Sequence, residues 1–285
     1  MNFINVVSVE NMRRSDAHTI AEHTSSSELM HRAASGIFNA VQFVGKVAIV
    51  CGKGNNGGDG YALACILCQH GIYPTIYRAC DGFSSDGLYY YKTALSLGAN
   101  EEPINTAGNF SGYDIVVDCL LGTGFKGKPT EEIKNAIEQI NSSSAYIISA
   151  DINSGINGDT GTAEVAVNSD LTVSIGAFKT GMFLNDAPYY IDSMVNVDIG
   201  IHFLEDVYKL IDYSHLHLFE GYNSIVMTAD EFYTKYGYNR ETCNIAQCIA
   251  ELSREERKTI VVKTDHSAVI ADLKYIYFSA DYIKV

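Results

Sequence analysis

Over the first 200 residues the hydrophobic positions alternate between short apolar runs and longer segments with helical spacing. Short runs rich in Val, Ile and Ala predict strands at 46–52, 73–79, 113–119, 145–151 and 171–176. Helical spacing of apolar residues predicts helices within 1–44 and at 61–70, 86–97 and 130–140. Strands that alternate with helices predict right-handed crossovers and a parallel sheet, with the helices of 1–44 covering one face.

These elements predict an α/β fold: a Rossmann-like three-layer sandwich with a mostly parallel central sheet and a small C-terminal α/β appendage. The first domain is expected at 1–202, and an extension at 203–285, where the pattern loosens into Tyr-rich and charged sequence. In such sheets ligands bind beyond the carboxyl ends of the strands. Chemistry is therefore expected at the strand ends marked by Gly52, Asp118 and Asp151.

A glycine-rich segment, Gly52–Gly60 (GKGNNGGDG), follows the first predicted strand and precedes a predicted helix. Its glycines match the GxGxxG pattern, in which small residues let backbone N–H groups at a helix N-terminus approach a phosphate. Two amides, Asn55 and Asn56, and a carboxylate, Asp59, stand in the same turn. Asp59 is interpreted as a helix cap, an acceptor for a ribose hydroxyl, or a group at the reacting end of a ligand. A purely structural turn is the alternative.

The amino-acid composition limits the classes of partner that the chain is expected to bind. The net charge of −14 opposes binding to nucleic acid or to an anionic membrane, and no apolar stretch reaches the length of a membrane span. The seven cysteines and the absence of a signal-peptide pattern favour reduced thiols and a cytoplasmic location. Cys65 and Cys68 form a CxxC within an apolar run, which we interpret as buried core thiols. His215 and His217 form an HxH without a third metal ligand.

Four segments together resemble one family. GKGNNGGDG, VVDCLLGTGFKG (116–127), DINSG (151–155) and LTVSIGAFKTG (171–181) are similar, in this order, to the YjeF N-terminal domain family, whose enzymes are NAD(P)H-hydrate epimerases. The resemblance implies epimerisation of the R and S forms of hydrated NADH and NADPH (NADHX and NADPHX). It also implies a potassium ion.

The resemblance assigns roles residue by residue. It implies substrate contacts by Asn55, Asn56, Gly57, Gly58, Asp59, Gly122, Thr123, Gly124, Phe125, Lys126, Gly127, Lys128 and Asp151. It implies potassium ligands at Asn56, Asp118 and Ser154. The sequence departs from the family at Asn153, where a proline is usual, so the loop loses a fixed φ and is expected to be looser.

The substrate chemistry requires a proton donor. Protonating the hydroxyl beside the ring nitrogen expels water and leaves a planar iminium, to which water returns on the other face. A carboxylic acid that donates and then removes a proton is the minimum catalyst, and burial would raise its pKa toward neutrality. We expect Asp151 in this role, with Asp59 as the second candidate.

The sequence also bears on the C-terminal extension and on two alternative functions. Segments 225–237 and 259–278 faintly resemble part of the nucleotide-dependent dehydratase domain often fused to such epimerases, and indicate a degenerate fragment or an ordinary α/β extension.

One alternative function is a nicotinamide-dependent dehydrogenase, which would need a further His or Lys for the proton transfer that accompanies hydride transfer. A non-catalytic binding or scaffold protein is the other rival, since relatives serve in mRNA decapping and lipoprotein binding. A homodimer is compatible with the resemblance.

Overall fold

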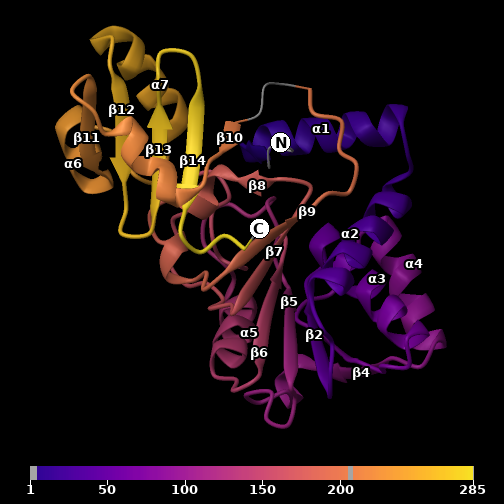
Figure 1. Cartoon of the computed structure of the whole chain (residues 1–285). Coiled ribbons are helices and arrows are strands. Elements are labelled where there is room, and N and C mark those ends of the chain that lie inside the picture. Colours follow the sequence, from indigo (N-terminus) through magenta and orange to yellow (C-terminus); the bar gives the residue numbers. More distant parts are fainter. Residues whose placement is uncertain (1–4, 205–207, 285) are drawn as a thin grey trace.

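The structure, a computed structural model, describes residues 5–204 and 208–284 and contains two seven-stranded sheets (Figure 1). The strands are β1 (Asn5–Val7), β2 (Val47–Cys51), β3 (Thr75–Arg78), β4 (Asn100–Pro103), β5 (Ile115–Cys119), β6 (Tyr146–Ala150), β7 (Leu171–Ile175), β8 (Phe178–Lys179), β9 (Met194–Val197), β10 (Tyr208–Leu210), β11 (Ser224–Thr228), β12 (Thr259–Lys263), β13 (Ser267–Ala271) and β14 (Ile276–Ala280). The α-helices are α1 (Val9–Glu22), α2 (Ser26–Ala40), α3 (Asn55–Gln69), α4 (Ser85–Ser96), α5 (Glu131–Asn141), α6 (Ala229–Tyr236) and α7 (Ile245–Glu256). Short 3₁₀ helices η1 (Ile104–Thr106), η2 (Thr180–Phe183), η3 (Ala187–Tyr189) and η4 (Tyr213–Phe219) lie between them.

The first sheet is parallel throughout, in the order β4-β3-β2-β5-β6-β7-β9. Helices α2, α3 and α4 cover one face, and α5 covers the other (Figure 1). Residues of β2, β5 and β6 alternate between the two cores, because successive side chains in a strand point to opposite faces. The predicted three-layer α/β architecture is confirmed.

Only one of the two N-terminal helices covers this sheet. Helix α2 packs on it through Leu29, Ala33 and Ile37, whereas α1 contributes Met12 to a separate small cluster with Val7 and other residues. The prediction that the helices of 1–44 share one face is therefore right for α2 and wrong for α1. The apolar stripe of α1 is too narrow to cover a sheet, since its interior-facing positions include Asn11, Ser15 and Thr19. These polar residues bond within the helix and to the segment at 202–204.

The second sheet is mixed and joins distant parts of the chain, in the order β11-β12-β13-β14-β10-β1-β8. Its last two strands come from the first 200 residues: β1 pairs antiparallel with β10 and parallel with β8. Helices α6 and α7 pack on one face, and one continuous core unites them with Phe178, Phe183 and Met194. The extension therefore shares a sheet and a core with the preceding region.

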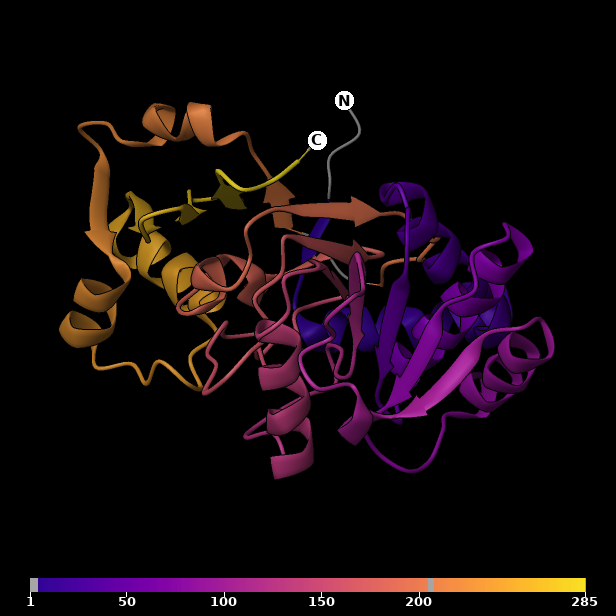
Figure 2. The ribbon, with the colours of Figure 1, turned by 90° about the horizontal axis from the view of Figure 1, so that it is seen from below.

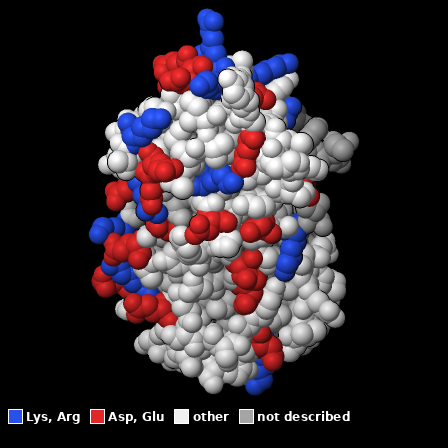
Figure 3. All heavy atoms as spheres, turned by 60° about the vertical axis from the view of Figure 1, so that its left-hand side comes forward, with Lys and Arg blue, Asp and Glu red and all other residues white. Residues whose placement is uncertain are grey.

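The extension and helices α2–α4 lie at opposite ends of the molecule (Figure 2). On the face shown in Figure 3, acidic side chains and lysine or arginine side chains are interspersed rather than separated into large patches. Within residues 5–204 and 208–284, no helix has the length and apolar character needed to cross a bilayer.

Both cysteine and histidine interpretations can be compared with the structure. All seven cysteines are free, and Cys65 and Cys68 lie buried on α3. His215 and His217 lie on η4 rather than on a strand, and both are exposed. The CxxC is thus part of a helix core, and the HxH is a solvated pair.

Candidate functional site

The strand order reverses between β2 and β5, because β3 and β4 lie on one side of β2 and β5, β6 and β7 lie on the other. Ligands of open α/β sheets bind at such a reversal, beyond the carboxyl ends of the strands. The Gly52–Gly60 segment follows β2, Asp118 is the penultimate residue of β5, and Asp151 follows β6 directly. The topology therefore brings these three predicted positions to one edge.

The glycine-rich segment differs from its prediction. Helix α3 begins at Asn55 rather than near Tyr61, so most of the expected loop is the first turn and a half of a helix. Glycine propensity predicts a loop, but close packing overrides it: a Cβ on Gly57 would lie 2.0 Å from the carbonyl oxygen of Gly52, and one on Gly58 would lie 2.5 Å from the Met30 side chain. The glycines let the helix pack against its neighbours.

This helix start is open toward the site. The N-cap residue of α3, Gly54, offers no side-chain hydrogen bond, whereas Ser8, Ser25 and Ser84 cap α1, α2 and α4 with their hydroxyls. The first N–H groups of α3 therefore have no side-chain acceptor and, with the helix dipole, favour an anion. Asn55 is exposed at this end.

Asp118 organises the centre of the site. Its carboxylate is fully buried and accepts hydrogen bonds from the Ser154 hydroxyl (2.6 Å), the Ser154 N–H (2.9 Å), the Ser149 hydroxyl (2.9 Å) and the Leu120 N–H (3.1 Å). Burial raises the pKa of Asp118, and the hydrogen bonds from Ser154 offset part of that rise. The Ser154 hydroxyl also accepts from the Leu121 N–H at 2.8 Å. The ends of β5 and β6 are thus tied together.

Asn56 completes this group from α3. Its Nδ2 donates to the Leu121 carbonyl oxygen at 2.9 Å, but its Oδ1 is buried without a hydrogen-bond partner. A buried acceptor without a donor is costly and calls for a missing partner such as a water or a cation. Asn56, Asp118 and Ser154, the three predicted potassium ligands, therefore lie around Leu121.

Asp151 is held in an unusual conformation. Its φ is +69°, in the left-handed region that residues other than glycine seldom adopt and that clusters at functional sites. Its Oδ2 accepts from the Thr123 N–H at 3.1 Å, and its Oδ1 accepts from the ammonium of Lys179. Lys179 has no exposed surface, and its Nζ also donates to the Ile175 carbonyl oxygen at 2.9 Å.

Sequence reasoning gave Lys179 no role. The available signal was the segment 171–184 (LTVSIGAFKTGMFL), in which Lys179 is the one charged residue. A lysine in such a segment is rarely buried unless it is paired. Its partner, however, is 28 residues away in sequence and is identified only by the fold.

A second carboxyl group faces the same region. Burial raises the pKa of Asp59 well above its usual value, and the charges of Asp151 and Asp16 raise it further. Burial also raises the pKa of Asp16, on α1, with a contribution from the charge of Asp151. Three carboxyl groups from three elements therefore influence one another beside the single ammonium of Lys179.

The segment 122–128 divides into two parts. Gly122 lies against Asp151 and Asn56. A Cβ added at Gly122 would lie 3.1 Å from Oδ2 of Asp151 and 3.2 Å from the Cβ of Asn56. Gly122, Thr123 and the turn closed by the Phe125 N–H on the Gly122 carbonyl oxygen thus border Asp151. After Gly124 the segment runs outward through Lys126, Gly127 (φ +84°) and Lys128.

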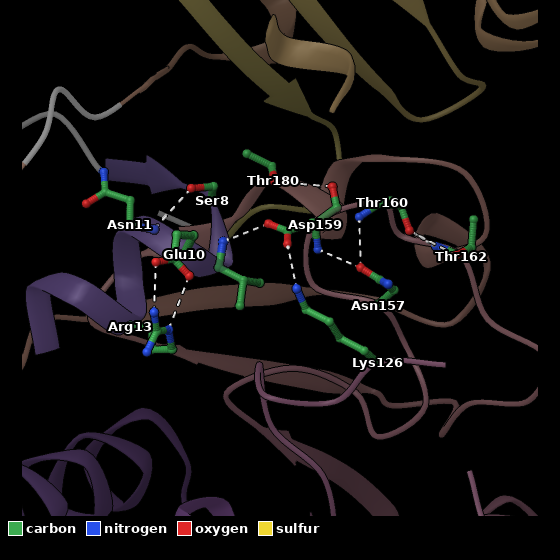
Figure 4. A network of polar contacts seen from close by, with 11 residues as sticks. Ser8, Glu10, Asn11, Arg13, Lys126, Asn157, Asp159, Thr160, Thr162 and Thr180 are labelled. Atoms are coloured by element: carbon green, nitrogen blue, oxygen red, sulfur yellow. Dashed lines mark hydrogen bonds and ion pairs between the residues drawn. The ribbon is translucent and has the colours of Figure 1, made fainter. Parts of the chain in front are cut away.

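The outer part of this segment, residues 126–128, is held by ion pairs. Lys128 pairs with Glu164 at 2.7 Å, and Lys126 lies 4.0 Å from Asp159. Asp159 also accepts from the Val9 N–H at 2.8 Å, so it links this segment to the start of α1 (Figure 4). The two lysines are exposed and lie away from Asp118 and Asp151 along the segment.

Asn153, the departure from the family pattern, is completely buried. Its Nδ2 lies within 2.9 Å of three acceptors, the carbonyl oxygens of Val167 and Tyr190 and the Ser169 hydroxyl. Its Oδ1 accepts from the Thr172 hydroxyl at 2.5 Å. These bonds anchor the loop at the position where the family has a proline, and a looser loop stays a prediction.

Comparison with known proteins identifies related sequences. Residues 26–181, more than half of the chain, match the sequence model described as YjeF-related protein N-terminus. The NAD(P)H-hydrate epimerase of Rhodopirellula baltica is 34% identical over 182 residues, which cover 61% of this chain and 75% of that protein. The NAD(P)H-hydrate epimerase of Weissella koreensis is 30% identical over 206 residues, covering 69% and 91%.

Other relatives are longer. The bifunctional NAD(P)H-hydrate repair enzyme Nnr of Coxiella burnetii is 33% identical over 185 residues, which cover 62% of this chain and 38% of that protein. The chain thus spans well under half the length of this relative. The crystal structure of yeast ynu0 superposes with a TM-score of 0.55 at 18% identity, covering 66% of this chain and 84% of that one. This similarity supports a common fold.

Proposed function

The chain belongs to the YjeF-related N-terminal family, and from this membership we propose that it epimerises the R and S forms of hydrated NADH and NADPH. The observation that carries the proposal is the meeting of Asp59, Asp151 and Lys179 beside the open N-terminus of α3. An anion site next to paired acid–base groups suits a dinucleotide whose nicotinamide end reacts. Of the other candidate substrate contacts, Gly57, Gly58, Gly122 and Thr123 border the same edge, whereas Lys126 and Lys128 lie farther out.

We assign different roles to the two carboxyl groups. The Asp151 carboxylate pairs with the buried ammonium of Lys179, and we assign Asp151 as the base. Burial raises the pKa of Asp59 well above its usual value, which favours the protonated form, and we assign Asp59 as the acid. Two carboxyl groups whose environments separate their proton affinities are a common source of paired acid–base catalysis. The sequence predicted one carboxyl group in both roles, with Asp151 as the first candidate and Asp59 as the second, whereas we propose that the two groups share them.

The reaction follows from these roles. Asp59 donates its proton to the ring hydroxyl, the C–O bond breaks, and the ring nitrogen lone pair forms a planar iminium as water leaves. Water adds to the opposite face, Asp151 takes the proton that this water loses, and the centre is inverted. Proton exchange with solvent then returns Asp59 to its acid form and Asp151 to its carboxylate. The cationic ring is stabilised by the negative charge of Asp151, because fixed charges in a partly buried site act strongly on developing charge.

The residues around Leu121 fit a potassium ion. Hard cations prefer oxygen ligands, and Asn56 Oδ1 is a buried oxygen without a donor. Asn56, Asp118 and Ser154 would hold the ion, and Asp118 would exchange one of its four hydrogen bonds for it. The ion would supply positive charge and would fix the ends of β5, β6 and the start of α3.

A direct assay tests the proposal. The R and S forms of NADHX are separated by chromatography and followed with and without the protein, in potassium and then in sodium buffer. Fast equilibration that requires potassium is the expected result. Equilibration no faster than in buffer, with dinucleotide binding retained, would favour a non-catalytic binding protein of the same fold. The cytoplasmic location and the homodimer stay predictions.

A further inference from the structure

Arg78 lies at the position that determines, in many dinucleotide-binding domains, whether NAD or NADP is bound. It is the last residue of β3, in register with Cys51, which directly precedes the glycine-rich segment. In folds with this strand order, an acidic residue near this strand end binds the ribose hydroxyls, or an arginine there accommodates a 2′-phosphate. The strands that lead to Asp118 and Asp151 lie on the other side of β2.

This arrangement gives the bound dinucleotide a direction. With the pyrophosphate at the start of α3 and the nicotinamide near Asp59 and Asp151, the adenosine half extends over β3. The turn after β3 supports this path, because Gly82 lies beside Lys53 of the glycine-rich segment, with 3.8 Å from an added Cβ to the Lys53 Cβ. Arg78 and its turn therefore border the adenosine half.

The side chain of Arg78 is fixed by two aromatic rings, and two carboxylates lie near its guanidinium without hydrogen-bonding to it. The guanidinium carbon lies 4.4 Å from the Phe83 ring centroid and 5.6 Å from that of Tyr91. The carboxylates of Glu101 and Asp81 lie 3.6 and 3.9 Å from its terminal nitrogens, beyond hydrogen-bonding distance. Stacking holds a planar fork in place, and such forks bind phosphate in a bidentate manner. Its side chain is 23% exposed, so the group remains accessible.

We propose that Arg78 binds the 2′-phosphate of the substrate and makes NADPHX the preferred substrate over NADHX. The inference rests on the proposed dinucleotide site. Glu101 accepts a hydrogen bond from the Tyr91 hydroxyl at 2.7 Å, and Asp81 is fully exposed. Because neither carboxylate hydrogen-bonds to the guanidinium, a 2′-phosphate would make charge-assisted hydrogen bonds there that these carboxylates do not make. NADHX has no 2′-phosphate and gains nothing from Arg78.

The experiment compares kcat/KM for the two substrates in wild type, Arg78→Gln and Arg78→Lys. Wild type should prefer NADPHX by roughly ten- to hundred-fold, the value of a charge-assisted contact. Arg78→Gln should remove this preference through the KM of NADPHX alone, and Arg78→Lys should restore part of it. Unchanged NADHX kinetics in the same variant show that the protein is folded. Lys53→Gln is the matched control and should weaken both substrates alike.

Equal kcat/KM values in wild type, or a preference that survives Arg78→Gln, would overturn the inference while leaving the epimerase proposal intact. If neither substrate is epimerised, the proposed function fails instead. Titration calorimetry with NADPH and NADH then decides the role of Arg78 separately. Tighter binding of NADPH that Arg78→Gln abolishes supports it, and equal affinities contradict it.

Discussion

The two sheets differ in how their strands are assembled. The central strands β2, β5 and β7 of the parallel sheet are buried along their whole length, and each crossover in this sheet is local in sequence. The mixed sheet joins β1 and β8 to strands that begin after residue 207. The parallel sheet positions Asp118 and Asp151, whereas the mixed sheet ends at β8, which carries Lys179.

The comparison shows why the extension matters to the site. Lys179 reaches Asp151 from a two-residue strand that is paired only with β1, and β1 is in turn paired with β10. Further bonds tie the end of the chain to the same region: the Tyr282 hydroxyl donates to the Met182 carbonyl oxygen at 2.7 Å. The second sheet thus supports the ammonium that the first sheet's carboxylate requires. Four substitutions test this division, in order of their expected effect on stability.

Replacing Lys179 by Met should have the largest effect. It leaves the largely buried Asp151 carboxylate without its partner, which should lower the free energy of unfolding by about 3–5 kcal/mol. Epimerisation should also be lost, because Asp151 no longer has a fixed charge partner. Urea unfolding and the epimer assay measure the two effects. Lys128→Met breaks an exposed pair with Glu164 and should change stability by only about 0–1 kcal/mol. Equal effects of the two variants would contradict the account.

Phe278→Ala tests the link between the extension and β8. Phe278 is fully buried, and its ring centroid lies 5.2 Å from that of Phe183. Phe183 lies in η2, which directly follows Lys179 in the sequence. The cavity should cost about 3–5 kcal/mol and should also lower kcat at temperatures where the variant is folded. Ile137→Ala on α5, also fully buried, should cost about 2–5 kcal/mol with kcat unchanged. A wild-type kcat for Phe278→Ala would show that the extension does not influence the catalytic site.

Asn153→Ala tests the hydrogen bonds that replace the family's proline. It removes the partners of buried groups on Val167, Tyr190 and Thr172 and should cost about 1–3 kcal/mol of unfolding free energy. Thermal unfolding measures the loss. The exposed Asn168→Ala is the control and should lie close to wild type. A wild-type melting temperature for Asn153→Ala would mean that these bonds add nothing.

Asp59→Asn should instead stabilise the protein at neutral pH. Above the ordinary aspartate pKa of 3.8, the unfolded chain releases the proton that the folded protein keeps, because its Asp59 pKa is raised. Wild-type stability therefore falls as pH rises from there toward the folded pKa, and the asparagine variant escapes this loss. Unfolding at a series of pH values should show a gain that disappears toward pH 4. A destabilised Asp59→Asn at neutral pH would contradict the raised pKa.

The sequence predicted the parallel sheet well because its strands and helices have distinct apolar patterns. The strands at 46–52, 113–119 and 171–176 appear within a few residues of their predicted limits. The start of α3 was misplaced, since glycine propensity outweighs a packing requirement that is visible only in three dimensions.

The second sheet and part of the site could not be predicted. Strands β1 and β8 have three and two residues, too few for any periodicity, and their partners lie far along the chain. Asp118, Asp151 and Ser154 could be nominated because they stand at strand ends within family motifs. The pairing of Asp151 with Lys179 and the burial of Asp59 depend on contacts between elements, so the separation of acid and base was beyond sequence reasoning.

We propose that Asp151, paired with Lys179, is the base of an epimerase. The most direct measurement is the interconversion of R and S NADHX by Asp151→Asn in potassium buffer, with substrate binding followed by titration in the same samples. The account predicts interconversion at the rate of buffer alone, with NADHX still bound. Interconversion at the wild-type rate would contradict it.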